Sequence, residues 1–528
     1  MRLFDMKKGR LRTLLAQAGV AIAVAALIAG CGNAYRPVVT PITPSGPAAQ
    51  PTSYAVVVSS TGATTPGVAT IVDYSGDTIM AIAPIGPGPI AFTIDEVAAN
   101  GYTVNSDGTL TNFPISTSLQ AKNVLVSTLP STAQPVNLLA PSTGLWAADL
   151  TGNVADVFQG SPQKLSLAVP VPTMPVFVAG APTVVGQRNF VVSQNPQSLA
   201  GFTSTSCNSS PSTVGENGVV TPIESSYVAD APIQLDPTAG SGTTNAQCPV
   251  FAVESTDLKR LFVLNRGSDT VSVINVQDNT LDQCTPFQNQ SGQTVNCHPI
   301  LPLSTTAVAN TGVTPPNGTA GMKAIAGPVD AEYNAATSQL VVADYDGGTI
   351  SVIDVSLDEY GNDSATFGTT YTIAVGQTAN PLPASVTVLS DGSKAYTANQ
   401  GDCTPDCTTS PNGTVSVVNL STHTLEKTLA VVGNPRTVLN TQNSEYDKVY
   451  AAAPNSPYVT IIETTPTEVD VIDTTLLVEG NVVDIRLTTQ TGSSGNNNYA
   501  SRVPGYGEPC NLPDKSHTDS LTDCRAIQ

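Results

Sequence analysis

The chain has 528 residues and a formal net charge of -20, with 41 Asp and Glu against 21 Lys and Arg. This acidic balance disfavours nucleic acid and anionic lipid headgroups as partners. Charged residues make up only 12% of the chain, whereas Gly (42) and Pro (41) are frequent, a composition typical of many short strands and turns. The hydrophobic share of 40% is enough to build a core, which excludes a disordered chain.

Residues 1–30 are predicted to be a secretory signal peptide. Five basic residues between Arg2 and Arg12 precede an apolar run from Leu14 to Gly30. The run ends in Leu27-Ile28-Ala29-Gly30-Cys31, which resembles the bacterial lipoprotein lipobox, where a peptidase cuts just before a cysteine that carries diacylglycerol. The resemblance implies that Cys31 is acylated, with chains such as palmitate, and that the lipid bilayer is a partner. An ordinary signal peptide or membrane anchor is the alternative.

The residue after Cys31 indicates a membrane location, and the segment that follows indicates a tether. Gly32 stands where a lipoprotein retained in the inner membrane would typically carry Asp, so we expect the outer membrane or the cell surface of a bacterium. Residues 31–53 are rich in Pro, Ala, Thr and Ser, with five prolines between Pro37 and Pro51. At ~3.1 Å per residue in polyproline II, such a tether would span roughly 60 to 70 Å.

From residue 54 onward, short apolar runs recur. The stretch from Leu261 to Val276 consists of two apolar runs joined by a short polar turn, which predicts a β-hairpin. The same pattern returns from Leu340 to Val355 and from Ala395 to Leu420. A recurring hairpin indicates a repeat architecture.

Two landmarks order the repeats: a proline that opens a strand and, 11 to 15 residues later, an aromatic or β-branched residue in the next strand. The seven pairs are Pro89 and Tyr102, Pro135 and Trp146, Pro175 and Phe190, Pro249 and Phe262, Pro328 and Val341, Pro383 and Tyr396, and Pro435 and Tyr450. Before the first pair, residues 54–59, 68–73 and 77–83 supply the last three strands of a unit that lacks its first strand. After the last pair, residues 481–489 supply a first strand without the other three.

These counts predict an all-β fold, a β-propeller of four-stranded blades, closed by pairing of the N- and C-terminal strands. The count gives eight blades, with seven as the alternative. We assign the propeller to residues 54–490, with disulfide-stapled insertions at 203–248, 277–320 and 400–411. Residues 491–528 are predicted to be a C-terminal disulfide loop.

The repeats resemble the YVTN type of β-propeller, which is related in shape to bacterial surface-layer and lactonase-like propellers. The Tyr-Val-Thr-Asn tetrapeptide of these propellers corresponds to Phe262-Val263-Leu264-Asn265 and to Tyr396-Thr397-Ala398-Asn399. The pattern that follows the tetrapeptide in the family corresponds to residues 348–354. The family's Val-Gly-x-Pro link corresponds to residues 432–435. The resemblance is good from about residue 250 to residue 465, and it implies the fold. It supplies no catalytic set, because no such residues are matched.

Nine cysteines leave eight once Cys31 is set aside. An even number in an exported chain favours disulfides. Neighbouring cysteines share an insertion, so we predict four pairs: Cys207 with Cys248, Cys284 with Cys297, Cys403 with Cys407, and Cys510 with Cys524. We predict no metal site, because the Cys403 and Cys407 spacing lacks a second pair of ligands nearby.

No other residues suggest chemistry. His298, His423 and His517 share no motif, and we expect them at the surface. The carboxylates of Asp344-Tyr345-Asp346 are expected to serve a turn, since calcium would need more oxygen ligands. No nucleotide or nucleophile motif is present, so no cofactor is predicted.

The expected function is that of an exported, membrane-anchored lipoprotein whose propeller serves as a binding or scaffold module at the cell envelope. Its partner would be an envelope protein or polysaccharide. We favour binding over catalysis. One alternative is a lactonase-like or quinoprotein-like enzyme, which requires charged side chains that converge in the central channel, and another is a structural component of surface-layer type.

Overall fold

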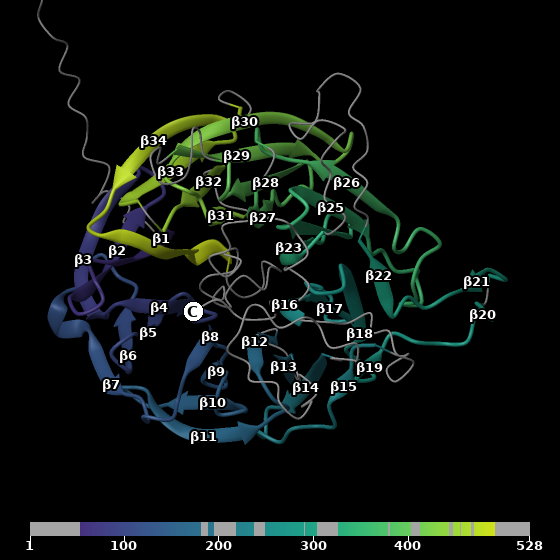
Figure 1. The fold of residues 1–528 in the computed structure, drawn as a ribbon, viewed down its shortest axis with the longest axis horizontal. Helices are drawn as coiled ribbons and strands as arrows, with labels where there is room; N and C mark the ends of the chain where they lie inside the picture. Colours follow the sequence, from purple (N-terminus) through teal and green to yellow (C-terminus); the bar gives the residue numbers. More distant parts are fainter. Residues whose placement is uncertain are drawn as a thin grey trace, which may run out of the picture. The chain divides into compact units, whose positions relative to one another are not determined.

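The computed structural model describes residues 53–180, 188–194, 218–236, 249–289, 291–303, 326–378, 381–402, 412–442, 447–454, 456–465 and 469–490. Their strands form eight sheets, each following a four-strand antiparallel path, and one small two-stranded hairpin. The first strands of the sheets contact one another in a closed cycle around a common centre (Figure 1). The fold is therefore an eight-bladed β-propeller, as the repeat count predicts.

Each blade has four strands, ordered from the centre outward. The inner strands are β35 (Asn481–Leu487), β4 (Pro89–Ile94), β8 (Pro135–Leu139), β12 (Pro175–Gly180), β16 (Pro249–Glu254), β23 (Pro328–Asn334), β27 (Pro383–Val388) and β31 (Thr437–Asn440). The second strands are β1 (Tyr54–Ser60), β5 (Asn100–Asn105), β9 (Leu145–Asp149), β13 (Arg188–Ser193), β17 (Arg260–Asn265), β24 (Gln339–Asp344), β28 (Lys394–Asn399) and β32 (Lys448–Ala452).

The outer half of each blade is equally regular. The third strands are β2 (Pro66–Asp73), β6 (Thr109–Pro114), β10 (Val154–Gln159), β14 (Val219–Glu224), β18 (Thr270–Asn275), β25 (Thr349–Asp354), β29 (Asn412–Asn419) and β33 (Tyr458–Glu463). The outer strands are β3 (Thr78–Pro87), β7 (Leu125–Thr128), β11 (Lys164–Pro170), β15 (Ile233–Gln234), β19 (Thr280–Leu281), β26 (Thr370–Ala374), β30 (Thr424–Val432) and β34 (Val471–Leu477).

The remaining elements are short. They are β20 (Phe287–Gln288), β21 (Thr294–Val295), β22 (Ile300–Pro302) and the 3-10 helices η1 (Ala121–Asn123) and η2 (Thr488–Gln490). Both β19 and β22 pair with β18, so the fourth strand of that blade is split in two by the hairpin of β20 and β21. Neither 3-10 helix could cross a bilayer, and no other helix occurs among the described residues.

The ring closes through the two ends of the propeller, as the sequence predicts. Strand β35 pairs with β1, and β2 and β3 complete the same blade. In Figure 1 these first strands, drawn in purple, lie beside the last strands, drawn in yellow. Val57 pairs with Ile485 across the junction, and both side chains are fully buried. Closure of this kind pairs the edges that β1 and β35 would otherwise expose, and unpaired edges of this sort invite aggregation.

The sequence landmarks fall at equivalent places. Six of the seven prolines are the first residue of an inner strand, where a missing N–H costs no ladder bond, and Pro435 stands two residues before β31. Their seven partners all lie on second strands. Phe262, Val263 and Leu264 are each 0% exposed, because neighbouring blades cover both faces of the sheet. This burial explains why the strands lack polar alternation.

A hydrogen-bonding module fixes the second strand to the third. Asn399 ends β28, and its Nδ2 donates to Thr414 Oγ1 and Ser416 Oγ, both at 2.9 Å. Two other blades repeat the arrangement, through Asn265 with Thr270 and Ser272 and through Asn105 with Thr109 and Thr111. The Asn that ends the tetrapeptide and the hydroxyls that follow it are therefore one structural unit.

A second module joins neighbouring blades. Lys448 opens β32, and its Nζ lies 2.5 Å from Asp77 Oδ2 of the next blade, while the Tyr450 hydroxyl donates to Asp77 Oδ1 at 3.3 Å. Lys394 and Tyr396 hold Asp470 in the same way. The Lys448 and Asp77 pair bridges the last complete blade to the blade that closes the ring.

Candidate functional site

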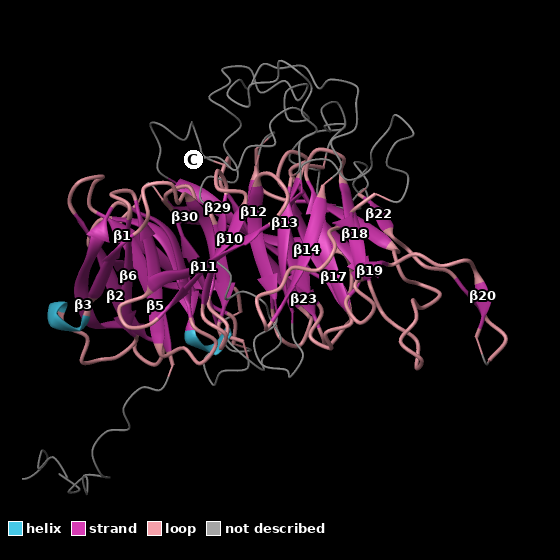
Figure 2. Ribbon diagram, turned by 90° about the horizontal axis from the view of Figure 1, so that it is seen from below, coloured by secondary structure: helices cyan, strands magenta, loops and turns pink. Residues whose placement is uncertain are grey.

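The antiparallel strand order gives the ring two unlike faces. The inner strands all begin at one face, at residues such as Pro89 and Asn481, and we call this the insertion face. Four long connections start and end there, between residues 194 and 218, 236 and 249, 303 and 326, and 402 and 412. Figure 2 shows the ring from the side, with the strands running between the two faces. Strand β1 begins at the opposite face, where Tyr54 N donates to Thr488 Oγ1.

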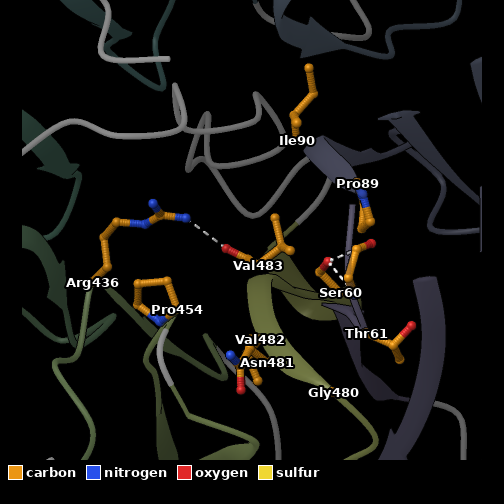
Figure 3. Close-up of a pocket in the computed structure, with 11 residues that line it drawn as sticks. Ser60, Thr61, Pro89, Ile90, Arg436, Pro454, Gly480, Asn481, Val482 and Val483 are labelled. Atoms are coloured by element: carbon orange, nitrogen blue, oxygen red, sulfur yellow. Dashed lines mark hydrogen bonds between the residues drawn. The ribbon is translucent and has the colours of Figure 1, made fainter. Parts of the chain in front are cut away.

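A pocket of about 610 Å³ opens on the insertion face, and we call it the closure pocket. It is built from the beginnings and ends of strands in three consecutive blades, including the one that closes the ring (Figure 3). Its lining residues are Ser60, Thr61, Gly62, Pro89, Ile90, Arg436, Pro454, Gly480, Asn481, Val482 and Val483. A volume of this size lies within the usual range of roughly 300 to 1,000 Å³ for small-molecule sites.

Arg436 is the charged member of that lining. It follows Pro435 and precedes β31, and one guanidinium nitrogen, Nη2, donates to Val483 O at 2.8 Å (Figure 3). The contact links the last complete blade to β35 of the closing blade. Gly480, at φ +78°, allows the approach of the chain at this junction, since a Cβ there would lie 2.5 Å from Ser60 O. Only glycine is compatible with both the φ angle and the spacing.

The inner strands satisfy one another's backbone amides around the channel. Asn137 Oδ1 accepts a hydrogen bond from Val178 N at 2.8 Å, and Asp330 Oδ2 accepts one from Val386 N at 2.9 Å. In each case the acceptor stands two residues after the strand-opening proline, and the donor stands three residues after the proline of the next blade. An inner strand has no sheet neighbour on its channel side, so its buried amides need such partners.

The carboxylates that an enzyme would need in the channel are engaged in the same role. Glu332 accepts from Thr387 Oγ1 at 3.0 Å and from Gln442 Nε2 at 2.9 Å. Asp484 lies 2.8 Å from the Arg486 guanidinium and is 5% exposed. The contact of Glu332 with Thr387 joins adjacent blades, its contact with Gln442 reaches one blade further, and the Asp484 pair lies within β35. Both carboxylates therefore have structural partners.

One charged cluster lies at the perimeter and was not foreseen. Arg260 Nη2 lies 3.0 Å from Asp363 Oδ1, whose other oxygen is 2.7 Å from His298 Nδ1. His298 also stacks on Phe367, so it is half-buried rather than a surface residue. The cluster lies at the base of the β20 and β21 hairpin, which projects beyond the ring (Figure 2). No sequence motif joins residues 260, 298 and 363, because the first opens β17, the second precedes β22 and the third lies between β25 and β26.

Two further histidines and the acidic turn at residues 344–346 were also considered from the sequence, and the structure describes His423 and the turn. His423 is half-buried against Tyr371, with ring centroids 3.6 Å apart, while His517 lies outside the described residues. Asp346 does more than serve a turn, because it forms a two-pronged ion pair with Arg266 at 3.1 Å on both oxygens. Burial raises the pKa of Asp344 to about 7.

One of the four predicted cysteine pairs lies within the described residues. Cys284 and Cys297 form a disulfide with Cα atoms 5.5 Å apart, the pairing that we expect from their spacing. The other predicted residues, Cys31, Cys207, Cys248, Cys403, Cys407, Cys510 and Cys524, lie outside the described residues. Within the described part of the chain, no group of three or more Cys, His, Asp or Glu side chains is placed to hold a metal ion.

The fold defines the class of protein as an eight-bladed β-propeller. No family model and no curated protein matches the chain.

Several solved structures resemble the propeller. A 6-phosphogluconolactonase-like protein from Bacteroides fragilis is 15% identical, with a TM-score of 0.46 over 84% of this chain and 99% of that one. AztD from Citrobacter koseri is 10% identical, with a TM-score of 0.48 over 82% and 97% of the two chains. The dihydro-heme d1 dehydrogenase NirN is 12% identical, with a TM-score of 0.49 over 86% and 78%. At these identities and TM-scores, nothing about the activity of this chain follows from the resemblances.

Proposed function

We propose that this protein is an exported lipoprotein, anchored through acylated Cys31, whose propeller binds a ligand in the closure pocket at the cell envelope. The observation that carries the proposal is the placement of that pocket. It opens on the insertion face, whereas the first strand begins at the opposite face. The pocket therefore lies on the face of the ring opposite to the one at which β1, the strand that follows the predicted tether in the sequence, begins.

The lining of the pocket supports binding rather than catalysis. Arg436 is its charged residue, and the other ten described lining residues are apolar, hydroxyl-bearing, amide or glycine. General acid and base catalysis needs a carboxylate, imidazole or similar group within hydrogen-bonding reach of the substrate. On the inner strands, the carboxylates of Asp330, Glu332 and Asp484 have structural partners, which weakens the case for a channel enzyme.

Two measurements test the proposal. Labelling of cells with radioactive palmitate should mark the wild-type chain, whereas Cys31→Ser should lose the label and Cys297→Ser should keep it. Equal labelling of the Cys31→Ser chain would refute the anchor. A thermal-shift panel of sugars, lactones, quinones, metal ions and envelope fragments should yield a ligand, since a compound at 100 times its Kd adds about 2.7 kcal/mol to the folded state.

The panel also separates this proposal from its alternatives. Turnover of a lactone or quinone hit would favour an enzyme of the channel type. A silent panel together with concentration-dependent self-association would favour a structural envelope component. A hit that binds without turnover, and that loses affinity when Arg436 is changed, is the result expected of a binding module.

A further inference from the structure

We propose that β34, the outer strand of the last complete blade, pairs edge to edge with β34 of a second copy of this chain. The two strands run antiparallel about a two-fold axis at Thr474 and join two rings side by side. The inference concerns the rim of the propeller. It goes beyond the proposed function, because it uses neither the anchor nor the closure pocket.

Strand β34 has an open edge. Among the described strands it pairs with β33 alone, as the last in the order β31-β32-β33-β34. It lies at the perimeter of the ring (Figure 1), where another molecule can reach it. An open strand edge carries backbone N–H and C=O groups outside any ladder, so it is a template for pairing with another chain.

The exposed side chains of β34 are largely apolar. Leu477 is 57% exposed, Val471 is 45% exposed and Ile472 is 36% exposed. Asp473 is the one charged residue in the sequence of the strand. An exposed edge that combines apolar and β-branched residues with little charge is a site of association with another strand.

The other long outer strands carry residues that discourage such pairing. Among the described outer strands, β3, β11, β30 and β34 are seven residues or longer. Strand β3 contains Pro84 and Pro87, β11 contains Lys164 and Pro170, and β30 contains Lys427. Lysine opposes edge pairing because its charge would be buried, and proline because it lacks an N–H. The sequence of β34 has neither residue.

Strand β30 provides the closest comparison, because it pairs with its neighbour in the same pattern as β34. Each strand has a bulge at the equivalent place. Counted from the bulge, Lys427 of β30 corresponds to Thr474 of β34, and Ala430 corresponds to Leu477. The bulge is common to both edges, so the difference between them lies in the missing lysine and the larger apolar side chain.

The sequence of β34 is complementary to itself in the antiparallel direction. Pairing about Thr474 places Val471 opposite Leu477, Ile472 opposite Leu476, and Asp473 opposite Thr475. Apolar side chains thus meet apolar ones, and the carboxylate meets a hydroxyl that can donate to it. An axis at Asp473 would instead oppose two carboxylates, which is destabilising. The occupant that fits this edge is therefore a second copy of the chain.

Pairing of this kind closes at two copies. The same strand serves on both sides of the axis, so the interface is isologous and uses up the β34 edge of each copy. A closed dimer differs in this respect from the open array of a structural envelope component. The strand supplies seven residues per copy, fewer than the roughly 20 to 30 of a standard interface, so we expect a weak, concentration-dependent dimer.

Disulfide cross-linking at residue 474 tests the pairing. Opposite residues of antiparallel strands have Cα atoms about 4.5 to 5.5 Å apart, which a disulfide can bridge. Under mild oxidation, the purified full-length chain with Thr474→Cys should give a linked dimer on a non-reducing gel. Leu167→Cys is the matched control, since Leu167 holds the equivalent position on β11. Equal cross-linking of both variants, or none at residue 474, overturns the proposal.

Sedimentation velocity of the same chain over a range of concentrations gives the second test. Thr474→Lys introduces the residue that β30 carries at this position, so the fold should tolerate it. It should raise the concentration of half-association by at least about tenfold, whereas Leu167→Lys should leave it unchanged. Unfolding curves establish that each variant is folded, and if Thr474→Lys unfolds, the cysteine cross-link decides.

The outcomes distinguish this inference from the proposed function. A wild-type chain that stays monomeric, association that continues beyond the dimer, or a dimer that survives Thr474→Lys would each overturn the pairing of β34. None of these results affects palmitate labelling at Cys31 or the ligand panel. Conversely, loss of the label or a silent panel would leave the β34 dimer as it stands.

Discussion

Asp344→Asn should stabilise the propeller at high pH and leave its stability unchanged at low pH. Asp344 ends β24 and is 0% exposed, and its Oδ2 accepts hydrogen bonds from Thr349 at 3.0 Å and Ser351 at 2.7 Å. Burial raises the pKa of this carboxyl from 3.8 to about 7. The folded chain thus retains a proton that the unfolded chain releases above pH 3.8, so stability falls as pH rises from there to about 7 and stays reduced above it.

The magnitude follows from the size of the shift. Three units of pKa correspond to about 4 kcal/mol, and relaxation of the buried site reduces the effect, so we expect a gain of roughly 1 to 4 kcal/mol above pH 7. An amide fits this position, because Asn265 and Asn399 occupy it in two other blades and donate to the same pair of hydroxyl positions. The asparagine has no proton to lose in this range.

The assay is urea unfolding of the wild type and the variant at several values between pH 4 and pH 8. The difference between the two free energies of unfolding should grow with pH and level off near pH 7. Asn399→Asp is the reciprocal control, and it should lose stability over the same interval. The reasoning would be refuted if the difference in free energy of unfolding were constant with pH, or if the variant were less stable than the wild type at pH 8. Either result would mean that ionisation of Asp344 does not destabilise the wild type.

Three further predictions follow from the same contacts. Lys448→Met should cost roughly 3 to 5 kcal/mol in urea unfolding, because it leaves the buried Asp77 carboxylate without its cation, and Asp77→Asn should restore much of the loss. Cys284→Ser combined with Cys297→Ser should speed chymotrypsin cleavage after the exposed Phe287 while the unfolding midpoint of the ring stays the same; slow cleavage would contradict a stapling role. Asp156→Asn should raise stability above pH 7 and not below pH 4, because burial and the neighbouring Asp149 raise the pKa of Asp156 to about 7; a pH-independent gain would count against it.

The sequence predicts the ring because each blade repeats the same local constraint. A proline is tolerated at the start of an inner strand, and a large apolar residue is needed where two blades cover the second strand. Pro383 and Tyr396 show both features, since β27 begins at the first and the second is fully buried on β28. Such signals recur in a fixed order, so they can be counted without knowledge of the contacts.

The closure pocket could not be predicted in this way. Its residues come from five stretches between residues 60 and 483, and each is a strand end or a turn with no chemical motif of its own. Arg436 follows the recognisable link at Pro435, but its contact with Val483 depends on how the ring closes. The same reason applies to His298 and Asp363, which lie 65 positions apart in the sequence.

Placement of the pocket at the junction has a thermodynamic consequence. Arg436 belongs to the last complete blade, Asn481 to β35, and Ser60 to β1, the second strand of the closing blade. A ligand that contacts all three binds only when β35 is paired with β1, so it must stabilise the closed ring by RT ln(1 + [L]/Kd). Ligand binding and ring closure are therefore linked, and substitutions that weaken closure, such as Lys448→Met, should also weaken binding although they lie outside the pocket.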